Sequence, residues 1–170
     1  MSGADLHEAW LGQRRYTDLL PEAERALRQA GLYFLDAPRA EACLREAQRL
    51  APTHPAVLIG HYRFYLYKHR YVEAARCAQA CVVMAAQGIH VADDALAVTS
   101  DMLADVVSER DLRAWLFSCQ AYGYVLIRAG EAEAGRQLLA HVVSLDTANH
   151  TRTDALLSAI ALADAPDEDA

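Results

Sequence analysis

The feature of the sequence that most constrains the fold is an alternation between helix-patterned segments and short clusters of turn residues. Apolar residues recur with the helical period, and the alternation of β-branched residues that is typical of strands is absent. Asp36, followed by Pro38, is typical of a helix start. Gly88 and Gly130 stand where helices should end. The pattern predicts helices over residues 19–34, 38–50, 55–69, 71–86, 92–108, 112–128, 131–145 and 150–163, with a further short helix over 4–13.

Short gaps between these helices determine the fold class. Because only a few residues join one helix to the next, consecutive helices must run antiparallel as hairpins. The chain has 170 residues, of which 54% are hydrophobic, which is enough for one good core. We therefore predict an all-α fold with a single helical domain over residues 1–163. The acidic segment ADAPDEDA at 164–170 can bury little apolar surface and is expected to be a disordered tail.

Three of the expected hairpins share a small residue near the start of their second helix: Ala40, Ala74 and Ala134. Ala40 and Ala74 are 34 positions apart, whereas Ala134 follows Ala74 by 60 positions, so 26 extra residues lie between the second and third hairpins. One turn after the small residue, each hairpin has an apolar residue: Leu44, Ala78 and Leu138.

These residues and the 34-residue spacing resemble the tetratricopeptide repeat (TPR), a family of stacked helix hairpins. Pro52 closes the first repeat, and Tyr65 and Tyr71 fall where that family favours aromatic residues. The resemblance implies a short right-handed superhelical stack with one inserted segment and a C-terminal capping helix. The repeats would cover about residues 21–54, 55–88 and 115–148, with the insertion at about 87–111.

Two longer phrases, THPAVLIGHYRFYLYKHRYVEAA and AYGYVLIRAGEAEAGRQLL, carry a narrower resemblance. Together with their spacing, they are similar to a group of small TPR-like proteins encoded among bacterial nitrogen-fixation genes. That resemblance implies an accessory role in nitrogenase assembly or regulation.

The most aromatic stretch of the chain is HYRFYLYKHRY, residues 61–71. On a helix over 55–69 its side chains sort onto three faces. One face should contact the helix that begins at Tyr71: Leu58, Tyr62 and Tyr65. A second should turn toward the preceding hairpin: Val57, His61 and Phe64. The third points into the groove of a TPR-like stack: Ala56, Ile59, Arg63, Leu66 and Tyr67.

Stacked hairpins leave a concave surface that usually binds a peptide or a helix. The function predicted is therefore a non-enzymatic protein–protein interaction module, either an adaptor or an assembly chaperone. We expect an acidic residue of the partner near Arg63 and an apolar anchor near Gly123. The expected partner-binding residues are Ile59, Arg63, Leu66, Tyr67, Leu116, Cys119, Gly123, Leu126 and Ile127. Two alternatives are a secretion-type chaperone with three such repeats and a structural homodimer that uses the apolar groove edge.

Charge and hydropathy exclude several other classes of function. The formal charge of −7 argues against a nucleic-acid partner, whose binding face would be basic. No apolar run approaches the length of a membrane span, and the N-terminus lacks the layout of an export signal. We therefore expect a cytoplasmic protein that meets neither nucleic acid nor a membrane.

The cysteines and histidines favour packing over chemistry. Cys77 and Cys81 lie one helical turn apart, and no CxxC or HxxxH pair is present. His61 falls on a buried face, where a hydrogen-bonded core imidazole is the ordinary interpretation. His54, just before Pro55, is expected at a helix start. We expect no cofactor, no metal and no catalysis, because no nucleophile elbow or phosphate loop is present.

The insertion at 87–111 has two interpretations. Its predicted helix over 92–108 has an apolar stripe and an acidic face. In the simpler interpretation the helix packs on the stack and its acids are solvated. In the other it covers the groove near Arg63 and Arg70 and competes with the partner, so deleting 90–108 would strengthen binding.

Overall fold

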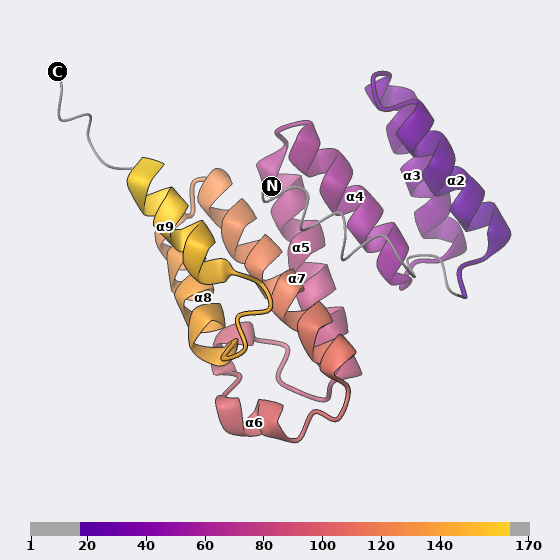
Figure 1. Ribbon diagram of the computed structural model, residues 1–170. Coiled ribbons are helices and arrows are strands. Elements are labelled where there is room, and N and C mark those ends of the chain that lie inside the picture. Colours follow the sequence, from indigo (N-terminus) through magenta and orange to yellow (C-terminus); the bar gives the residue numbers. More distant parts are fainter. Residues whose placement is uncertain (1–17, 164–170) are drawn as a thin grey trace, which may run out of the picture. The chain divides into compact units, whose positions relative to one another are not determined.

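The computed structural model describes residues 18–163, which form helices joined by turns and include no strand (Figure 1). The all-α prediction is confirmed. None of the helices in this range combines the length and the apolar character needed to cross a membrane. The helix predicted over 4–13 and the tail at 164–170 lie outside the described residues. The elements are α2 (Pro21–Leu32), α3 (Ala37–Leu50), α4 (Pro55–Tyr67), α5 (Tyr71–Gly88), the 3₁₀ turn η1 (Ala95–Ala97), α6 (Ser100–Ala104), α7 (Glu109–Arg128), α8 (Ala132–Leu145) and α9 (Thr153–Ala163).

Contacts within the chain divide it into two compact units, residues 1–84 and residues 85–170, which we name the N-terminal unit and the C-terminal unit. The boundary falls inside α5, so the repeat expected over 55–88 crosses it. The single domain and the three repeats stay predictions.

Local capping interactions explain where the helices of the N-terminal unit begin. The Asp36 side chain accepts a hydrogen bond of 3.2 Å from the backbone N–H of Arg39 and starts α3, as predicted. At α4 the Nδ1 atom of His54 accepts a hydrogen bond of 3.2 Å from the N–H of Ala56. His54 therefore caps α4, as expected, because its imidazole nitrogen accepts a hydrogen bond from one of the free N–H groups of the first turn.

Small residues between helices form the core of the N-terminal unit. Helix α2 packs along α3, and both helices contact α4. Alanines at the contacts let the helix axes approach closely. Val57 and Phe64 are buried against this hairpin, which confirms the prediction that these two residues face it. Tyr62 is also buried, with 5% of its surface exposed. The buried residues form two groups: Leu19, Ala23, Ala26, Ala47, Ala56 and Val57, and Ala30, Ala40, Leu44 and Phe64.

The small residues predicted at equivalent repeat positions are not all equivalent in the structure. Ala40 and Ala74 are completely buried, as expected. Ala134 is exposed, and the neighbouring Gly135 is the buried residue, so the assignment of Ala134 is wrong by one position. A Cβ atom on Gly135 would lie 2.5 Å from the carbonyl oxygen of Gly123. Glycine is therefore needed at this position, because α7 and α8 cross there with their backbones almost in contact.

A buried carboxylate organises the turn between α8 and α9 in the C-terminal unit. Asp146 accepts hydrogen bonds from the backbone N–H groups of His150 (2.9 Å) and Thr151 (2.8 Å) and from the Thr151 hydroxyl (2.8 Å). Gln120 of α7 donates a hydrogen bond of 2.9 Å to the carbonyl oxygen of Thr151. These bonds hold the start of α9, which packs against α8, close to α7.

The insertion differs from its prediction. Instead of one helix over 92–108, the structure has η1 and the single-turn helix α6, capped by Asp94 and Thr99. Two apolar residues that the sequence assigns to the apolar stripe of that helix, Met102 and Val107, are 47% and 101% exposed. The backbone between the two short elements is held by a hydrogen bond of 2.9 Å from His141 Nε2 to the Val98 carbonyl. Capping side chains interrupt the helix, because they satisfy backbone donors locally.

Candidate binding groove in the N-terminal unit

A groove lies between α2 and α4 in the N-terminal unit. Its cavity has a volume of about 300 Å³. One wall comes from the second half of α2 and the turn that follows, and the other comes from α4. The lining residues are Leu27, Arg28, Ala30, Gly31, Phe34, Leu44, Ala56, Gly60, Arg63, Phe64 and Tyr67.

The spacing of the α4 residues explains why they share one wall. Ala56, Gly60, Arg63 and Tyr67 recur at intervals of three or four residues, so they lie on one face of the helix. Gly60 has no side chain to fill the space, and Leu27 packs over it: a Cβ atom there would lie 3.1 Å from Leu27 Cδ2.

The opposite wall also includes a glycine. A Cβ atom on Gly31 of α2 would meet nothing within 4 Å. Gly31 is the second-last residue of α2 and is exposed, so this part of the wall opens to solvent.

Aromatic rings close one end of the groove. The ring of Phe34 makes edge-to-face contacts with Phe64 and Tyr67, at centroid distances of 6.1 and 6.4 Å. The Lys68 ammonium lies 4.3 Å from the centroid of the Phe34 ring. Tyr67 remains 47% exposed, so this end presents aromatic surface to solvent.

The charged residues that line the groove are both arginines, in a chain whose formal charge is −7. Arg28 on α2 forms an ion pair of 2.7 Å with Glu24. The Arg63 guanidinium on α4 lies 5.9 Å from the centroid of the Tyr67 ring. The groove therefore combines an apolar floor with one arginine on each wall, and the arginine on the α2 wall is ion-paired with Glu24.

The structure separates the expected partner-binding residues into two groups. Arg63 and Tyr67 line the groove, whereas Ile59 and Leu66 are partly buried and do not. In the C-terminal unit Leu116 and Cys119 are 1% and 0% exposed. Gly123 and Leu126 are also buried, and Ile127 is partly buried.

The expectation that the C-terminal set forms an accessible edge is therefore corrected. Gly123 faces α8, where a Cβ atom would lie 2.8 Å from Leu139. Leu116, Cys119 and Leu126 are likewise interior residues. Sequence alone could not distinguish these positions, since an apolar stripe looks the same whether it faces a partner or the core. The role of Arg63 and Tyr67 in binding stays a prediction.

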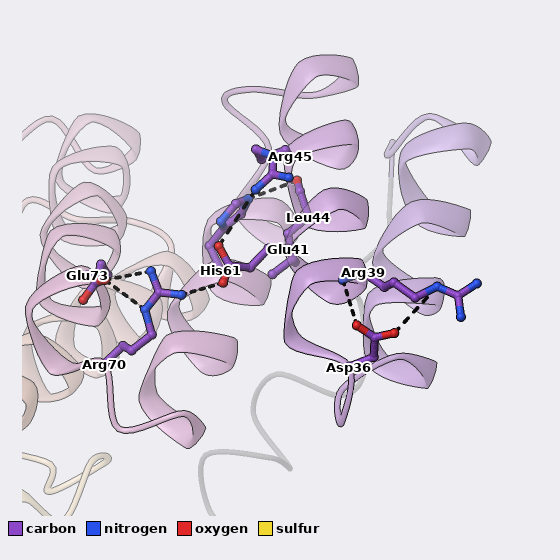
Figure 2. A network of polar contacts seen from close by, with 8 residues as sticks. All are labelled: Asp36, Arg39, Glu41, Leu44, Arg45, His61, Arg70 and Glu73. Carbon is purple, nitrogen blue, oxygen red and sulfur yellow. Dashed lines mark hydrogen bonds and ion pairs between the residues drawn. The ribbon is translucent and has the colours of Figure 1, made fainter.

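A second polar feature of the N-terminal unit is a network of ion pairs centred on Arg70, shown in Figure 2. Arg70 bonds to Glu41 of α3 at 2.5 Å and to Glu73 of α5 at 2.7 Å, and its guanidinium lies 4.6 Å from the Tyr65 ring centroid. The hydrogen bond to Glu73 raises the pKa of Arg70, and the same bond lowers the pKa of Glu73. Arg70 therefore ties α3 to the start of α5 and is not a lining residue of the groove.

The histidine that begins the aromatic stretch is a core residue, as predicted. His61 is 7% exposed, and its Nε2 atom donates a hydrogen bond of 3.0 Å to the Leu44 carbonyl oxygen (Figure 2). Burial lowers the pKa of His61, because the charged imidazolium loses its hydration. The neutral form is therefore the one that fits the core.

The four cysteines are free thiols, and burial makes three of them poor nucleophiles. Burial raises the pKa of Cys77 to about 11 and that of Cys81 to about 12, and it raises the pKa of Cys119 as well. Within residues 18–163, no group of three or more His, Cys, Asp or Glu side chains could hold a metal ion.

Comparison with known proteins places the chain beside a protein of Azotobacter chroococcum mcd 1, described as an uncharacterized 19.8 kDa protein in the nifW 5′ region. The two are 37% identical over 125 residues, which cover 72% of this chain and 70% of that protein. The chain belongs to the same family. No family model and no solved structure matches it.

The location of this relative agrees with the resemblance to proteins encoded among nitrogen-fixation genes. The assignment to the TPR family is not supported by a matching family model. Within the groove, sequence reasoning missed the α2 wall, above all Leu27 and Gly31. A glycine inside an otherwise regular helical pattern was the available signal, because such a residue usually has a packing or functional reason.

Proposed function

We propose that the protein is a non-enzymatic interaction module, an adaptor or assembly chaperone that serves nitrogen fixation in the cytoplasm. Its partner is a protein, and a peptide or helix of that partner occupies the groove between α2 and α4. The proposed architecture is a TPR-like stack of helix hairpins. The observation that carries the proposal is the groove itself, with its cavity of about 300 Å³, apolar floor and two arginines.

The chemistry of the lining supports binding over catalysis. Aliphatic and aromatic groups contribute contact area, and guanidinium groups bind carboxylates while staying protonated at every physiological pH. Arg28 and Arg63 are therefore suited to hold a charged segment and poorly suited to transfer a proton.

The family relationship supports the biological setting. The relative from Azotobacter chroococcum mcd 1 is encoded in the 5′ region of nifW. Genes that serve one process in bacteria are often neighbours, so an accessory role in nitrogenase assembly or regulation is the assignment that the relative favours.

A groove-filling variant tests the proposal in the native host. Gly31→Leu should place an isobutyl group in the open groove without a clash, because a Cβ atom there meets nothing within 4 Å. Gly88→Leu is the matched control, since Gly88 is also exposed and unobstructed but does not line the groove. The gene is deleted, and each variant is returned on a plasmid.

We expect the deletion strain to grow normally on ammonium and poorly on N₂. The wild-type chain and Gly88→Leu should restore growth on N₂, whereas Gly31→Leu should not, at equal protein levels on an immunoblot. Normal growth of the deletion strain on N₂ would refute the nitrogen-fixation role. Full rescue by Gly31→Leu would refute the groove as the working surface.

A further inference from the structure

The groove between α2 and α4 lies beside the point at which the described part of the chain begins. We propose that residues 4–13 of the same chain, where the sequence predicts a short helix, form an arm that occupies this groove until a segment of the partner displaces it. We name these residues the N-terminal arm. For the competing ligand the inference rests on the function proposed above, and it adds a regulator of that site.

Leu19 places the start of the described chain at one end of the groove. Its side chain is 8% exposed and belongs to the same buried cluster as Ala56, which lines the groove where α4 begins. Asp18 has a φ of +64°, a left-handed conformation that is typical of turns. A segment that precedes this turn therefore starts beside the groove and not in line with α2.

The length of the arm matches that of the groove. On α4 the lining residues run from Ala56 to Tyr67, which are eleven positions apart, or about 16 Å along the helix axis. A helix over residues 4–13 is about 15 Å long at the same rise per residue. Residues 14–18 join it to Leu19 and can span roughly 16 Å when extended, so the arm can run back along the groove toward Tyr67.

The sequence of the arm provides a face that suits the groove. Ala9 and Trp10 follow Leu6 by three and four positions, so these apolar residues share one side of a helix. The floor of the groove consists of leucine, alanine and phenylalanine side chains, which complement such a face. Asp5, four positions before Ala9, borders this face, and both charged lining residues of the groove are arginines. The charges are therefore complementary as well.

Covalent attachment favours the arm over a ligand that is free in solution. A segment on a short linker has an effective concentration of the order of millimolar at a site within its reach. The cavity of about 300 Å³ lies at the lower limit of pockets that enclose small molecules, so it suits a few side chains of a peptide segment. A partner must overcome this local competition, and the arm therefore sets a threshold for partner binding.

Tryptophan fluorescence tests whether the arm occupies the groove of the full-length protein. The chain has two tryptophans, and Trp115 is fully buried in the C-terminal unit. The difference between the emission of the wild-type chain and that of Trp10→Phe therefore reports on Trp10. We expect Trp10 to emit at the short wavelengths of a buried indole and to be protected from quenching by acrylamide.

Two pairs of variants locate the contact, and circular dichroism checks that each is folded. Gly31→Leu adds a side chain to the lining of the groove, so it should expose Trp10 and increase its quenching several-fold. Gly88→Leu, outside the groove, should leave the quenching unchanged. Within the arm, Leu6→Asp should expose Trp10 as Gly31→Leu does. Leu11→Asp should not, because Leu11 is five positions from Leu6 and lies on another side of the helix.

Three results would overturn the inference. The first is quenching of Trp10 in the wild-type chain that already equals its quenching in Gly31→Leu, and the second is an equal effect of Leu6→Asp and Leu11→Asp. The third is a dimer in light scattering that Leu6→Asp dissociates, which would place the arm in the groove of a second copy.

The growth assay separates this inference from the proposed function. If Trp10 is exposed in the wild-type chain and Gly31→Leu fails on N₂, the arm is refuted and the groove remains the partner's site. If Trp10 is protected and Gly31→Leu grows normally on N₂, the arm occupies the groove and the groove is not the working surface.

Discussion

The crossing of α7 and α8 offers the sharpest test of the structure, through the variant Gly135→Ala. A Cβ atom at this position would lie 2.5 Å from the carbonyl oxygen of Gly123, 2.6 Å from Cγ1 of Ile127 and 3.0 Å from its backbone N. Two of these three atoms belong to the backbone of α7. They cannot rotate away as a side-chain end could, so the two helices must separate or tilt.

The expected cost follows from two opposing contributions. Alanine is the better helix former and stabilises a helix by about 1 kcal/mol relative to glycine. Overpacking a close contact costs roughly 1–3 kcal/mol, and the backbone contacts place this site near the upper value. The net loss should be about 2 kcal/mol, which lowers the melting temperature of a chain of this size by roughly 4–8 °C.

Urea and thermal unfolding, followed by circular dichroism at 222 nm, measure this loss. Gly88→Ala is the control, because a Cβ atom on Gly88 meets nothing within 4 Å. That variant should be as stable as the wild-type chain or slightly more stable. If Gly135→Ala proves as stable as Gly88→Ala, the close approach of α7 and α8 does not exist in solution and the reasoning fails.

Three further predictions concern buried polar groups. Asp146→Ala removes three hydrogen bonds to a charged group and should lower the free energy of unfolding by roughly 3 kcal/mol, the upper value for such bonds. The exposed control Asp93→Ala should change the free energy of unfolding little. Equal effects of the two substitutions would contradict the role of Asp146 in holding the turn between α8 and α9. Burial lowers the pKa of His61, so the imidazole binds a proton more readily in the unfolded state than in the folded state. The contribution of neutral His61 to the stability of the fold is therefore present above about pH 6.5 and is lost as the pH falls. His61→Gln should therefore show a shallower loss of stability than the wild-type chain between pH 7 and 5 in urea titrations, and identical slopes would rule this out. Cys77 and Cys81, with pKa values of about 11 and about 12, should react with iodoacetamide at pH 7.5 far more slowly in the folded protein than in urea. Mass spectrometry measures the rate of alkylation, and equal rates in the two conditions would mean that the thiols are accessible.

The helix boundaries were largely predictable because the signals that set them are local. The helix expected over 71–86 is α5, Tyr71–Gly88, and the one expected over 131–145 is α8, Ala132–Leu145. Gly130 has a φ of +96°, which suits the helix end predicted there.

The insertion shows where local reasoning fails. Residues 92–108 carry a usable apolar stripe, yet they form η1 and α6 with an extended connection between them. The hydrogen bond from His141 to the Val98 carbonyl links this connection to α8, more than 40 residues away in the chain. Such a distant partner leaves no mark on the local periodicity.

The candidate site was only half predictable. The face of α4 that carries Arg63 and Tyr67 followed from the helical period alone. The wall formed by Leu27 and Gly31 did not, because it depends on the angle at which α2 lies beside α4.

By itself, therefore, the sequence determined an all-α chain of short antiparallel hairpins, because the helical period and the capping residues act within a few positions of one another. Tertiary structure alone decided that Gly135, and not Ala134, lies at the helix crossing, and that Leu116 and Cys119 are interior residues while Arg63 lines an open groove. The physical reason is that the surface a helix face meets depends on the side chains of both neighbours, and no single segment contains that information.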